Sequence, residues 1–509
     1  MGAQTQTIAW SEVESEWLEK QPNGGLNLAY QCLERNLAAG RAEQPAIIWR
    51  GAQNRRMVFT YAQLSAAAQR FAAALEWRGI RLAERVCTLG PRCPELYIAA
   101  LGTLRHGAVY APLFSVYGPE PIRRRLEVGE ARVVVTTKKL YEQRIAPIRG
   151  TLPSLEYIVL LDGAAPGAES WQEFCAAAPD DTAPPNIVTA AEFPALLLFT
   201  SGTTGPPKGV LHVHRAAAAL LASGRLVLGL EPGARYWCTA DPGWVTGVAY
   251  GLLAPLLCGA TLIVDEGKLD AARWYDILAK EAIQCWLTSP TALRLLRRSG
   301  IKTANHDLSA LERIFSTGEP LDPAITEWTQ QNLHQPTRDA WWQSETGSII
   351  TAQYADDPLT PGRMGRTAPG IEMILATVND NQVTPINAPG QTGEILIKRG
   401  WPSMFRAYLG APESYRQAFC DNWYRSGDLA QWDDNGELRF IGRADDVIKT
   451  AGHMVGPAEV EAVLNHHPEV AECGVSAIPD PVAGYLVAAW VVPRRRVDNA
   501  DKLRRDLIT

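Results

Sequence analysis

A glycine- and hydroxyl-rich segment directly after an apolar run is the clearest chemical signal in the sequence. Residues 196–210 read Leu-Leu-Leu-Phe-Thr-Ser-Gly-Thr-Thr-Gly-Pro-Pro-Lys-Gly-Val, which includes Thr200, Thr204 and Lys208. Glycines let backbone N–H groups approach an anion, hydroxyls add hydrogen-bond donors, and the lysine adds positive charge. The spacing does not fit the G-x-x-x-x-G-K-[ST] pattern of a Walker loop. The segment therefore predicts a phosphate-binding loop of another type.

Alternating helical and strand patterns surround this loop and would hold it in place. We expect helices at residues 62–77 and 94–105. The strands expected from there to residue 287 are 85–89, 133–137, 157–161, 195–199, 261–264 and 285–287. This alternation predicts parallel βαβ units with both sheet faces covered. Residues 162–185, rich in proline and glycine, are expected to form a surface excursion.

The pattern changes after Gly393, where strands flank turn residues in a hairpin style. After Asp445 we expect a helix from Pro457 to Leu464, strands at 473–478 and 487–492, and a last helix with Asp501 as its N-cap. The sequence thus predicts an α/β protein. Its large multi-sheet N-terminal domain, residues 1–444, has helices packed on parallel-rich sheets, and a small, incomplete α+β domain occupies residues 445–509.

Composition excludes several classes of protein. The chain has 509 residues and a net charge of −6, which argues against nucleic-acid binding through bulk positive charge. The nine cysteines form no C-x-x-C pair, so zinc-ribbon and thioredoxin-like proteins are excluded. With no secretory signal pattern at the start, we expect reduced thiols and a cytoplasmic location. Pro255 and Gly259 interrupt the longest apolar run, so we expect a buried helix and strand there and no membrane partner.

Five more blocks accompany the phosphate loop in a fixed order. They are Trp-Cys-Thr-Ala-Asp-Pro-Gly-Trp-Val-Thr-Gly at 237–247, Ser-Thr-Gly-Glu-Pro at 316–320, Asp-Ala-Trp-Trp-Gln-Ser-Glu-Thr-Gly at 339–347, Tyr-Arg-Ser-Gly-Asp at 424–428 and Gly-Arg-Ala-Asp-Asp at 442–446. Together the blocks resemble the AMP-forming acyl-CoA synthetases of the adenylate-forming superfamily. The resemblance covers nearly the whole chain and is closest to the acetyl-CoA synthetase branch.

The resemblance implies a ligase that activates a short-chain acid, acetate or propionate. Such an enzyme uses ATP to form an acyl-AMP and then transfers the acyl group to CoA, giving acyl-CoA, AMP and pyrophosphate. ATP, Mg²⁺ and CoA are the implied cofactors, and small molecules are the only implied partners. The first step needs charge neutralisation at the α-phosphate and an oriented carboxylate. The residues expected to be catalytic are Thr200, Thr204, Lys208, Ser344 and Glu345.

The resemblance also assigns roles around the nucleotide. Ser344 would contact the α-phosphate, and Glu345 would bind the magnesium ion that accompanies ATP. Asp428 would bind the ribose hydroxyls, and Arg443 would reach ribose and phosphate from the last strand before a hinge. Because a Ser-Gly pair precedes Asp428, we expect an exposed backbone and a free carboxylate at that position. The residues expected to line the adenine side are Gly318, Glu319, Pro320, Asp339, Ala340, Trp341, Trp342 and Gln343.

Two adjacent tryptophans, Trp341 and Trp342, bear on the choice of acid. In the acetyl-CoA synthetase branch the second of these residues fills the tunnel where longer acyl chains would lie. Trp342 is therefore expected to limit the acid to acetate or propionate, with Val245 and Thr246 as further walls, although a plain core role and a larger acid remain alternatives. Thr317 stands where that branch usually has valine, and its hydroxyl is expected to add polarity to the pocket wall.

The C-terminal part departs from the family in two ways. Asp445 matches the hinge, and Ala451 and Gly452 match the segment that approaches the pantetheine arm of CoA, but Met454 stands where an arginine usually binds the nucleotide phosphate. The family's catalytic lysine lies in a basic, glycine-containing loop near the C-terminus, and no such loop follows Val492. We therefore expect either a truncated ligase or, as the alternative, a pseudoenzyme or partner subunit that binds nucleotide with little ligase activity.

Overall fold

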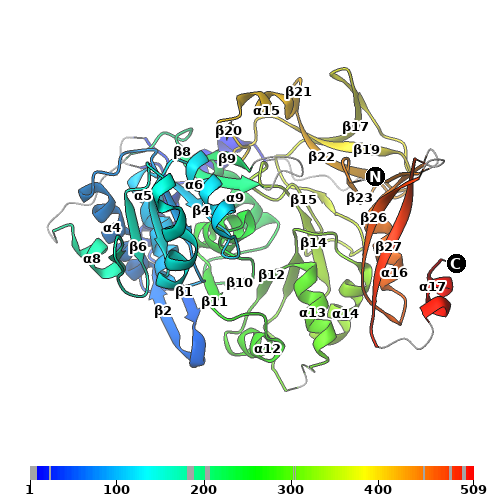
Figure 1. Cartoon of the computed structure of the whole chain (residues 1–509), viewed down its shortest axis with the longest axis horizontal. Coiled ribbons are helices and arrows are strands. Elements are labelled where there is room, and N and C mark those ends of the chain that lie inside the picture. Colours follow the sequence, from blue (N-terminus) through cyan, green and yellow to red (C-terminus); the bar gives the residue numbers. More distant parts are fainter. Residues whose placement is uncertain are drawn as a thin grey trace.

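The computed structural model describes residues 8–21, 24–179, 188–200, 207–301, 303, 305–446, 448–450, 453–480, 484–495 and 500–508. Two large sheets form the body of the protein (Figure 1). The eight-stranded sheet contains, in spatial order, β20 (Ala407–Leu409), β9 (Lys208–Val213), β8 (Pro194–Thr200), β4 (Val109–Pro112), β3 (Arg85–Leu89), β5 (Ala131–Thr136), β6 (Tyr157–Leu160) and β7 (Glu169–Ser170). The nine-stranded sheet contains β16 (Arg366–Thr367), β15 (Thr351–Ala352), β14 (Thr337–Trp341), β13 (Arg313–Ser316), β12 (Cys285–Thr288), β10 (Arg235–Cys238), β11 (Thr261–Asp265), β1 (Pro45–Arg50) and β2 (Arg56–Thr60).

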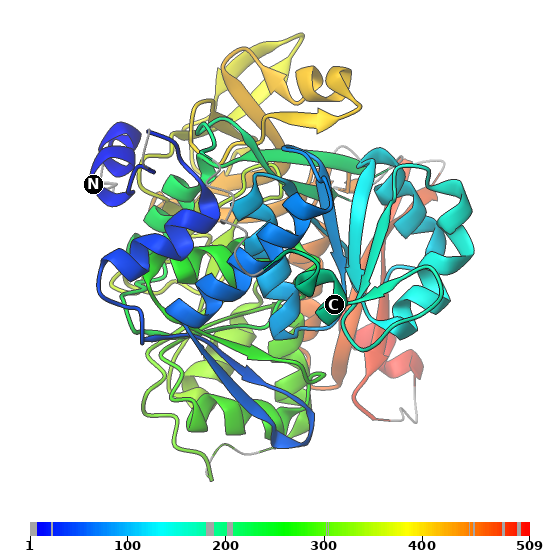
Figure 2. The same ribbon diagram turned by 90° about the vertical axis from the view of Figure 1, so that its left-hand side faces the viewer.

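A layer of helices lies between the two sheets, and Figure 2 shows it from the side. Successive residues of a strand point to opposite faces, so each sheet buries two different cores. On β12, Cys285 and Leu287 pack in the core shared by the two sheets, whereas Trp286 packs in the outer core. The helical segments of the shared core include α2 (Leu28–Cys32), α3 (Glu34–Ala38), α4 (Tyr61–Trp77), α5 (Pro94–His106), α9 (Ala216–Leu226), α10 (Val245–Val248), η5 (Ala249–Leu253) and α11 (Ala254–Cys258).

Outer helices cover the remaining face of each sheet. The nine-stranded sheet packs against α12 (Ala271–Lys280), α13 (Pro290–Ser299) and α14 (Pro323–Leu333). The eight-stranded sheet packs against α6 (Pro119–Val128), α7 (Lys138–Leu140), η3 (Tyr141–Ile145) and η4 (Ala146–Thr151). Five layers result, and most strand pairs in the two sheets are parallel. The expected α/β class with helices on parallel-rich sheets is confirmed.

The remaining strands form two antiparallel sheets. The first contains β18 (Gln382–Pro385), β17 (Met373–Asn379), β19 (Thr392–Lys398), β22 (Trp423–Trp432), β21 (Phe419–Cys420) and β23 (Leu438–Arg443), and α15 (Pro412–Gln417) lies beside it. The second contains β25 (His453–Val455), β24 (Ile448–Thr450), β27 (Gly484–Pro493) and β26 (Val470–Asp480), with α16 (Pro457–Asn465) packed on it and α17 (Ala500–Ile508) beyond it at one end of the molecule (Figure 1). These hairpins agree with the change of pattern seen after Gly393.

Local sequence explains several boundaries and corrects two expectations. Thr60 and Gln63 form a capping box that begins α4, and Gly107, with φ +81°, ends α5 in the left-handed region. Residues 162–185 are not only a surface excursion, because α8 (Trp171–Ala176) buries Phe174 there. The last helix begins at Ala500, so Asp501 lies in its first turn and is not its N-cap. In the part of the chain that the structure describes, every helix is too short or too polar to cross a bilayer.

Candidate active site

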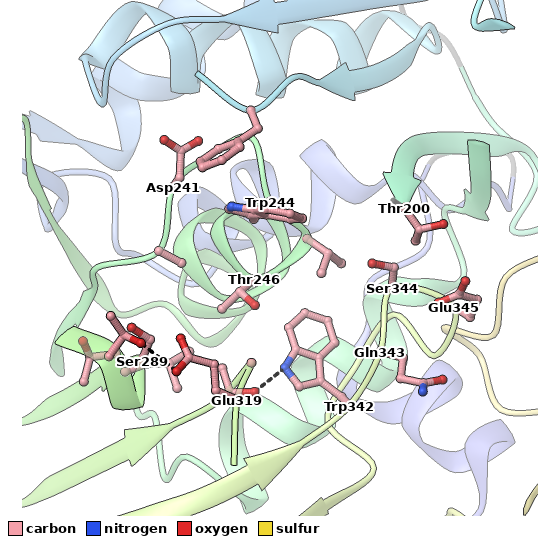
Figure 3. Close-up of a pocket in the computed structure, with 18 of the residues that line it drawn as sticks. Thr200, Asp241, Trp244, Thr246, Ser289, Glu319, Trp342, Gln343, Ser344 and Glu345 are labelled. Atoms are coloured by element: carbon pink, nitrogen blue, oxygen red, sulfur yellow. Dashed lines mark hydrogen bonds between the residues drawn. The ribbon is translucent and has the colours of Figure 1, made fainter. Parts of the chain in front are cut away.

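A cavity of about 1120 Å³ opens where the sheets meet, and Figure 3 shows part of its lining. The predicted site residues that line it are Thr200, Lys208, Val245, Thr246, Thr317, Gly318, Glu319, Trp342, Gln343, Ser344, Glu345 and Arg443. Thr317 follows β13 and Gln343 follows β14, and these two strands are parallel neighbours. The carboxyl ends of parallel strands meet at one edge of a sheet, which is where α/β proteins bind ligands. Thr204, Ala451 and Gly452 lie outside the described residues.

Glu345 lies beside the ends of β8 and β9, near Thr200 and Ser344 in Figure 3. The hydroxyl of Tyr408 donates a 2.8 Å hydrogen bond to Glu345 Oε1. The ammonium of Lys208 lies 5.0 Å from the centre of the Tyr408 ring. Burial is the largest influence on Glu345 and raises the pKa of its carboxyl, while the Tyr408 bond and the nearby cations lower it. Burial therefore makes the charged form of Glu345 unfavourable, whereas fixed donors favour it. This balance is expected of a carboxylate that binds a cation.

The surroundings of Glu345 fit a magnesium ion that arrives with a nucleotide. Mg²⁺ prefers oxygen ligands and is usually held by one or two carboxylates together with substrate phosphates and water. Glu345 is one of four carboxylates in the described lining of the cavity, together with Asp241, Glu319 and Glu394. Among the described residues, no cluster of three or more His, Cys, Asp or Glu side chains could hold a metal by itself. The site therefore suits a magnesium ion that is bound jointly by Glu345 and by the phosphates of the nucleotide.

Asp428 differs from its expectation in burial and in bonding. It lies in β22 and is only 5% exposed, so its backbone is not exposed and its carboxylate is not free. Oδ2 accepts hydrogen bonds from Trp341 Nε1 at 2.9 Å and from Gln343 Nε2 at 2.8 Å. Arg443 Nη1 lies 3.3 Å from Oδ1. Burial raises the pKa of Asp428, and the arginine and the two donors oppose that shift.

Trp342 is fixed from two sides at the other end of the cavity. Its indole N–H donates a 2.9 Å hydrogen bond to the hydroxyl of Thr317. Its ring meets that of Tyr250 edge-on, with 5.0 Å between centroids. Trp342 is 8% exposed, and Figure 3 shows it projecting towards Thr246. The Thr317 hydroxyl is therefore engaged by the indole, which links pocket polarity to the orientation of Trp342.

The residues expected on the adenine side do not all line the cavity. Glu319 lines it and accepts hydrogen bonds from Thr291 at 2.7 Å and Arg294 at 2.6 Å. Trp341 points to Asp428, as described above. Burial raises the pKa of Asp339 to about 7. Asp339, Ala340, Trp341, Pro320 and Asp428 are absent from the described lining of the cavity.

Sequence patterns missed four side chains that the structure brings to the site. Tyr408 contacts Glu345, Tyr250 contacts Trp342, and Tyr424 donates a 2.8 Å hydrogen bond to Gln343. His212 reaches the carbonyl oxygen of Ser344 at 2.8 Å. Two of them carried a local signal: Tyr424 opens the Tyr-Arg-Ser-Gly-Asp block at 424–428, and His212 lies four residues after Lys208, on the same face of β9.

Hinge-side residues complete the description. Asp445 Oδ1 accepts a 3.1 Å hydrogen bond from Arg443 Nε, between the end of β23 and the start of β24. The backbone of Met454 lies in β25. The 1–444 and 445–509 division remains a proposal.

Comparison with known proteins gives consistent matches over the chain. The family model described as AMP-binding enzyme matches residues 33–409, and the AMP-binding enzyme C-terminal domain model matches residues 459–509. An acetyl-coenzyme A synthetase of Bacillus subtilis (strain 168) is 37% identical, covering 95% of this chain and 84% of the relative. An acetyl-coenzyme A synthetase of Syntrophobacter fumaroxidans is 34% identical, covering 98% of this chain and 79% of the relative.

Solved structures agree with these matches. An anthranilate CoA ligase in complex with anthranoyl-AMP superposes with a TM-score of 0.85 at 26% identity, covering 95% of this chain and 90% of the ligase. An acyl-CoA synthetase of Brucella canis gives a TM-score of 0.79 at 28% identity, covering 98% of this chain and 90% of the synthetase.

Proposed function

The chain belongs to the AMP-binding enzymes and, with its acetyl-CoA synthetase relatives, to the AMP-forming acid–CoA ligases, and on this premise we propose its reaction. It joins acetate to ATP, forming acetyl-AMP and releasing pyrophosphate. The CoA thiol then attacks the acyl carbon, so that acetyl-CoA forms and AMP leaves. The observation that carries the choice of acid is Trp342, held by Thr317 inside the cavity that Glu345 also lines.

The residues near Glu345 support the first step. In-line attack by a carboxylate on the α-phosphate builds charge on the phosphate oxygens, which fixed donors and cations stabilise. We assign this task to Lys208 and Ser344, with Thr200 and Thr204 as further donors. Glu345 would hold Mg²⁺, which neutralises charge on the phosphates when bound. Tyr408 keeps the Glu345 carboxylate in one orientation through its 2.8 Å bond.

The residues near Asp428 support nucleotide binding. We assign the ribose to Asp428 and Arg443, and the adenine side to residues 318–320 and 339–343. Oδ2 of Asp428 already accepts two hydrogen bonds, so Oδ1 is the oxygen better able to accept from a ribose hydroxyl. Arg443, 3.3 Å from Oδ1, can then turn towards phosphate.

The residues around Trp342 support a small acid. An indole fixed by a hydrogen bond and by an edge-on aromatic contact occupies volume that a longer acyl chain would need. Val245 and Thr246 would close the remaining sides. Acetate fits this space best, and propionate is the next acid that we expect to react. Thr246, Ala451 and Gly452 are assigned to the path of the CoA thiol.

Pyrophosphate exchange tests the proposal with the full chain. Acetate should support ATP–pyrophosphate exchange, propionate should support it more slowly, and hexanoate should give only background. CoA should then convert the adenylate into the thioester. Glu345→Gln, which keeps the size of the side chain, should abolish exchange. ATP binding without exchange for any of these acids would replace the ligase assignment with that of a nucleotide-binding protein.

A further inference from the structure

His212 lies where the strand that leaves the phosphate loop passes beneath the Ser344–Glu345 turn. Its side chain is buried, at 1% exposure, and it follows Lys208 by four residues in β9. Nε2 lies 2.8 Å from the carbonyl oxygen of Ser344, and Nδ1 lies 3.0 Å from that of Ser403. One ring thus connects β9 with two separate loops of the cavity wall.

Both loops control the position of Glu345. The first loop contains Glu345 itself, directly after Ser344. In the second, the backbone N–H of Phe405 donates to the Glu345 carbonyl oxygen at 2.9 Å, and Tyr408, in the strand β20 that follows this loop, donates to the Glu345 carboxylate at 2.8 Å. A shift of the His212 ring would therefore move Glu345 and its hydrogen-bond partners relative to Lys208.

Packing around the ring leaves little freedom for either loop. A Cβ at Gly347, whose φ is +70°, would lie 2.9 Å from His212 Cε1 and 2.4 Å from the Ser403 carbonyl oxygen. The Ser403 hydroxyl donates a 2.7 Å hydrogen bond to the Thr346 carbonyl oxygen, which also accepts from Trp401 Nε1 at 2.9 Å. The two loops are thus joined around His212 by buried hydrogen bonds, and an interior packed this densely transmits displacement.

The protonation state of the His212 ring limits how many of its two contacts can be hydrogen bonds. Burial, the largest cause, lowers the pKa of His212 to about 4. The ring is then neutral near pH 7 and has a single N–H to donate. We assign that N–H to Nε2, because its contact with the Ser344 carbonyl oxygen is the shorter one, and Nδ1 then packs against the Ser403 carbonyl oxygen without donating to it.

We propose that His212 is a positioning residue for adenylation, which holds the Ser344–Glu345 turn in register with Lys208. It acts through those residues and touches no substrate. The identity of the reaction rests on the proposed function. A displacement of about 1 Å in a site that orients reacting groups can cost ~10²-fold in rate, so a small relaxation of this turn should be measurable.

His214 supplies a matched control on the same segment. It is also fully buried, at 0% exposure, and lies two residues further along the chain. Its Nδ1 accepts a 3.0 Å hydrogen bond from the backbone N–H of Leu28, at the start of α2 and away from the Ser344 turn. Replacing either histidine with leucine removes a buried imidazole, so a general effect on packing should appear in both variants.

The test compares His212→Leu and His214→Leu in the full chain through three measurements. His212→Leu should lower ATP–pyrophosphate exchange ~10–100-fold and weaken ATP binding by calorimetry ~3–10-fold. Its consumption of supplied acetyl-AMP by CoA should fall less than about 3-fold, because the adenylate is already formed. His214→Leu should change all three by less than about 3-fold. Equal losses in the two variants, or equal losses in both half-reactions of His212→Leu, would overturn the proposal.

A second pair of variants decides the question if His212→Leu does not fold. Gln can place an amide N–H near the position of Nε2 and so restore the bond to Ser344, whereas the shorter Asn reaches only towards Ser403. His212→Gln should therefore bind ATP more tightly and exchange faster than His212→Asn, and the reverse order would overturn the assignment. If wild type binds ATP but exchanges no pyrophosphate, the proposed function fails, and the ATP affinities of the variants still decide the role of His212.

Discussion

The residues that we assign to the nucleotide (the nucleotide end) and those that we assign to the acid (the acyl end) are held in place by different physical means. At the nucleotide end, Asp428 already accepts from Trp341 and Gln343, and Glu345 accepts from Tyr408. At the acyl end, Trp342 forms one hydrogen bond and otherwise packs against Tyr250. Polar groups that are oriented before a ligand arrives reduce the reorganisation that binding requires. A rigid apolar wall instead discriminates between acids by their volume. The contrast predicts that changes at the acyl end alter the choice of acid, while changes at the nucleotide end alter affinity for ATP.

Trp342→Gly should give the largest effect because it opens the acyl end. Hexanoate has four more methylenes than acetate, and burying each is worth about 0.8 kcal/mol, so the hexanoate-to-acetate ratio of kcat/KM should rise ~200-fold. ATP affinity should stay within about 2-fold. Pyrophosphate exchange across acids from acetate to octanoate measures the ratio. Trp342→Phe, which keeps most of the ring volume, is the control and should retain the preference for acetate. An unchanged ratio in Trp342→Gly would show that another residue sets the chain length.

Asp428→Ala should give the next largest effect, at the nucleotide end. The substitution removes a charged acceptor and leaves the N–H groups of Trp341 and Gln343 without it, so ATP binding should weaken by ~1–3 kcal/mol. The preference among acids should not change. Titration calorimetry with ATP and magnesium measures the affinity. Asp433→Ala is the matched control, because Asp433 also accepts from an arginine, Arg363 at 2.7 Å, in the same sheet region but is not a residue that we assign to the nucleotide. Equal losses in the two variants would remove the special role of Asp428.

The sequence predicted the parts of this comparison that are local in the chain. The glycine- and hydroxyl-rich segment and the Trp341–Trp342 pair are contiguous motifs, and the strand expected at 195–199, before the first of them, is β8 (Pro194–Thr200). No strand was expected at β14 (Thr337–Trp341), which leads to the tryptophan pair. Contacts between distant segments were missed. Tyr408 lies 63 residues from Glu345, and His212 lies 132 residues from Ser344, so only sheet register brings them together. The Ser-Gly pair before Asp428 suggested an exposed backbone and a free carboxylate, whereas alternation along β22 buries this residue.

Thr317→Val tests the single polar contact of the acyl end and should give a smaller effect. The indole N–H of Trp342 would lose its 2.9 Å partner, and a hydrogen bond of this kind is worth about 0.5–1.5 kcal/mol. A less firmly held ring should raise the hexanoate-to-acetate ratio ~2–10-fold. Thr317→Ser keeps a hydroxyl and is the control, with an expected change below about 2-fold. A stronger preference for acetate in Thr317→Val would show that the hydroxyl loosens the pocket instead of fixing it.

Asp339→Asn should give the smallest effect and concerns pH. Burial raises the pKa of Asp339 to about 7 from an ordinary value of 3.8. Between these values the folded protein holds a proton that the unfolded chain releases, so this group's contribution to stability is present at low pH and is lost as the pH rises to about 7. Asparagine stays neutral throughout, so Asp339→Asn should gain roughly 2–5 °C in Tm relative to wild type between pH 4.5 and pH 8.

Asp433 supplies the opposite case in that experiment. Desolvation is the largest single influence on Asp433 and raises its pKa, but hydrogen bonds from the backbone and from Arg363 together outweigh it and lower the pKa. The contribution of Asp433 to stability is therefore present above its ordinary pKa and is lost as the pH falls. Asp433→Asn should therefore lose stability relative to wild type at pH 7, and the difference should shrink towards acid pH. Trp342→Phe, at the acyl end, carries no titrating group and should show the wild-type dependence on pH. If the Tm of Asp339→Asn and that of wild type change with pH in the same way, Asp339 is ionised in the folded protein. The nucleotide end would then contain a charged carboxylate at Asp339 in spite of its burial.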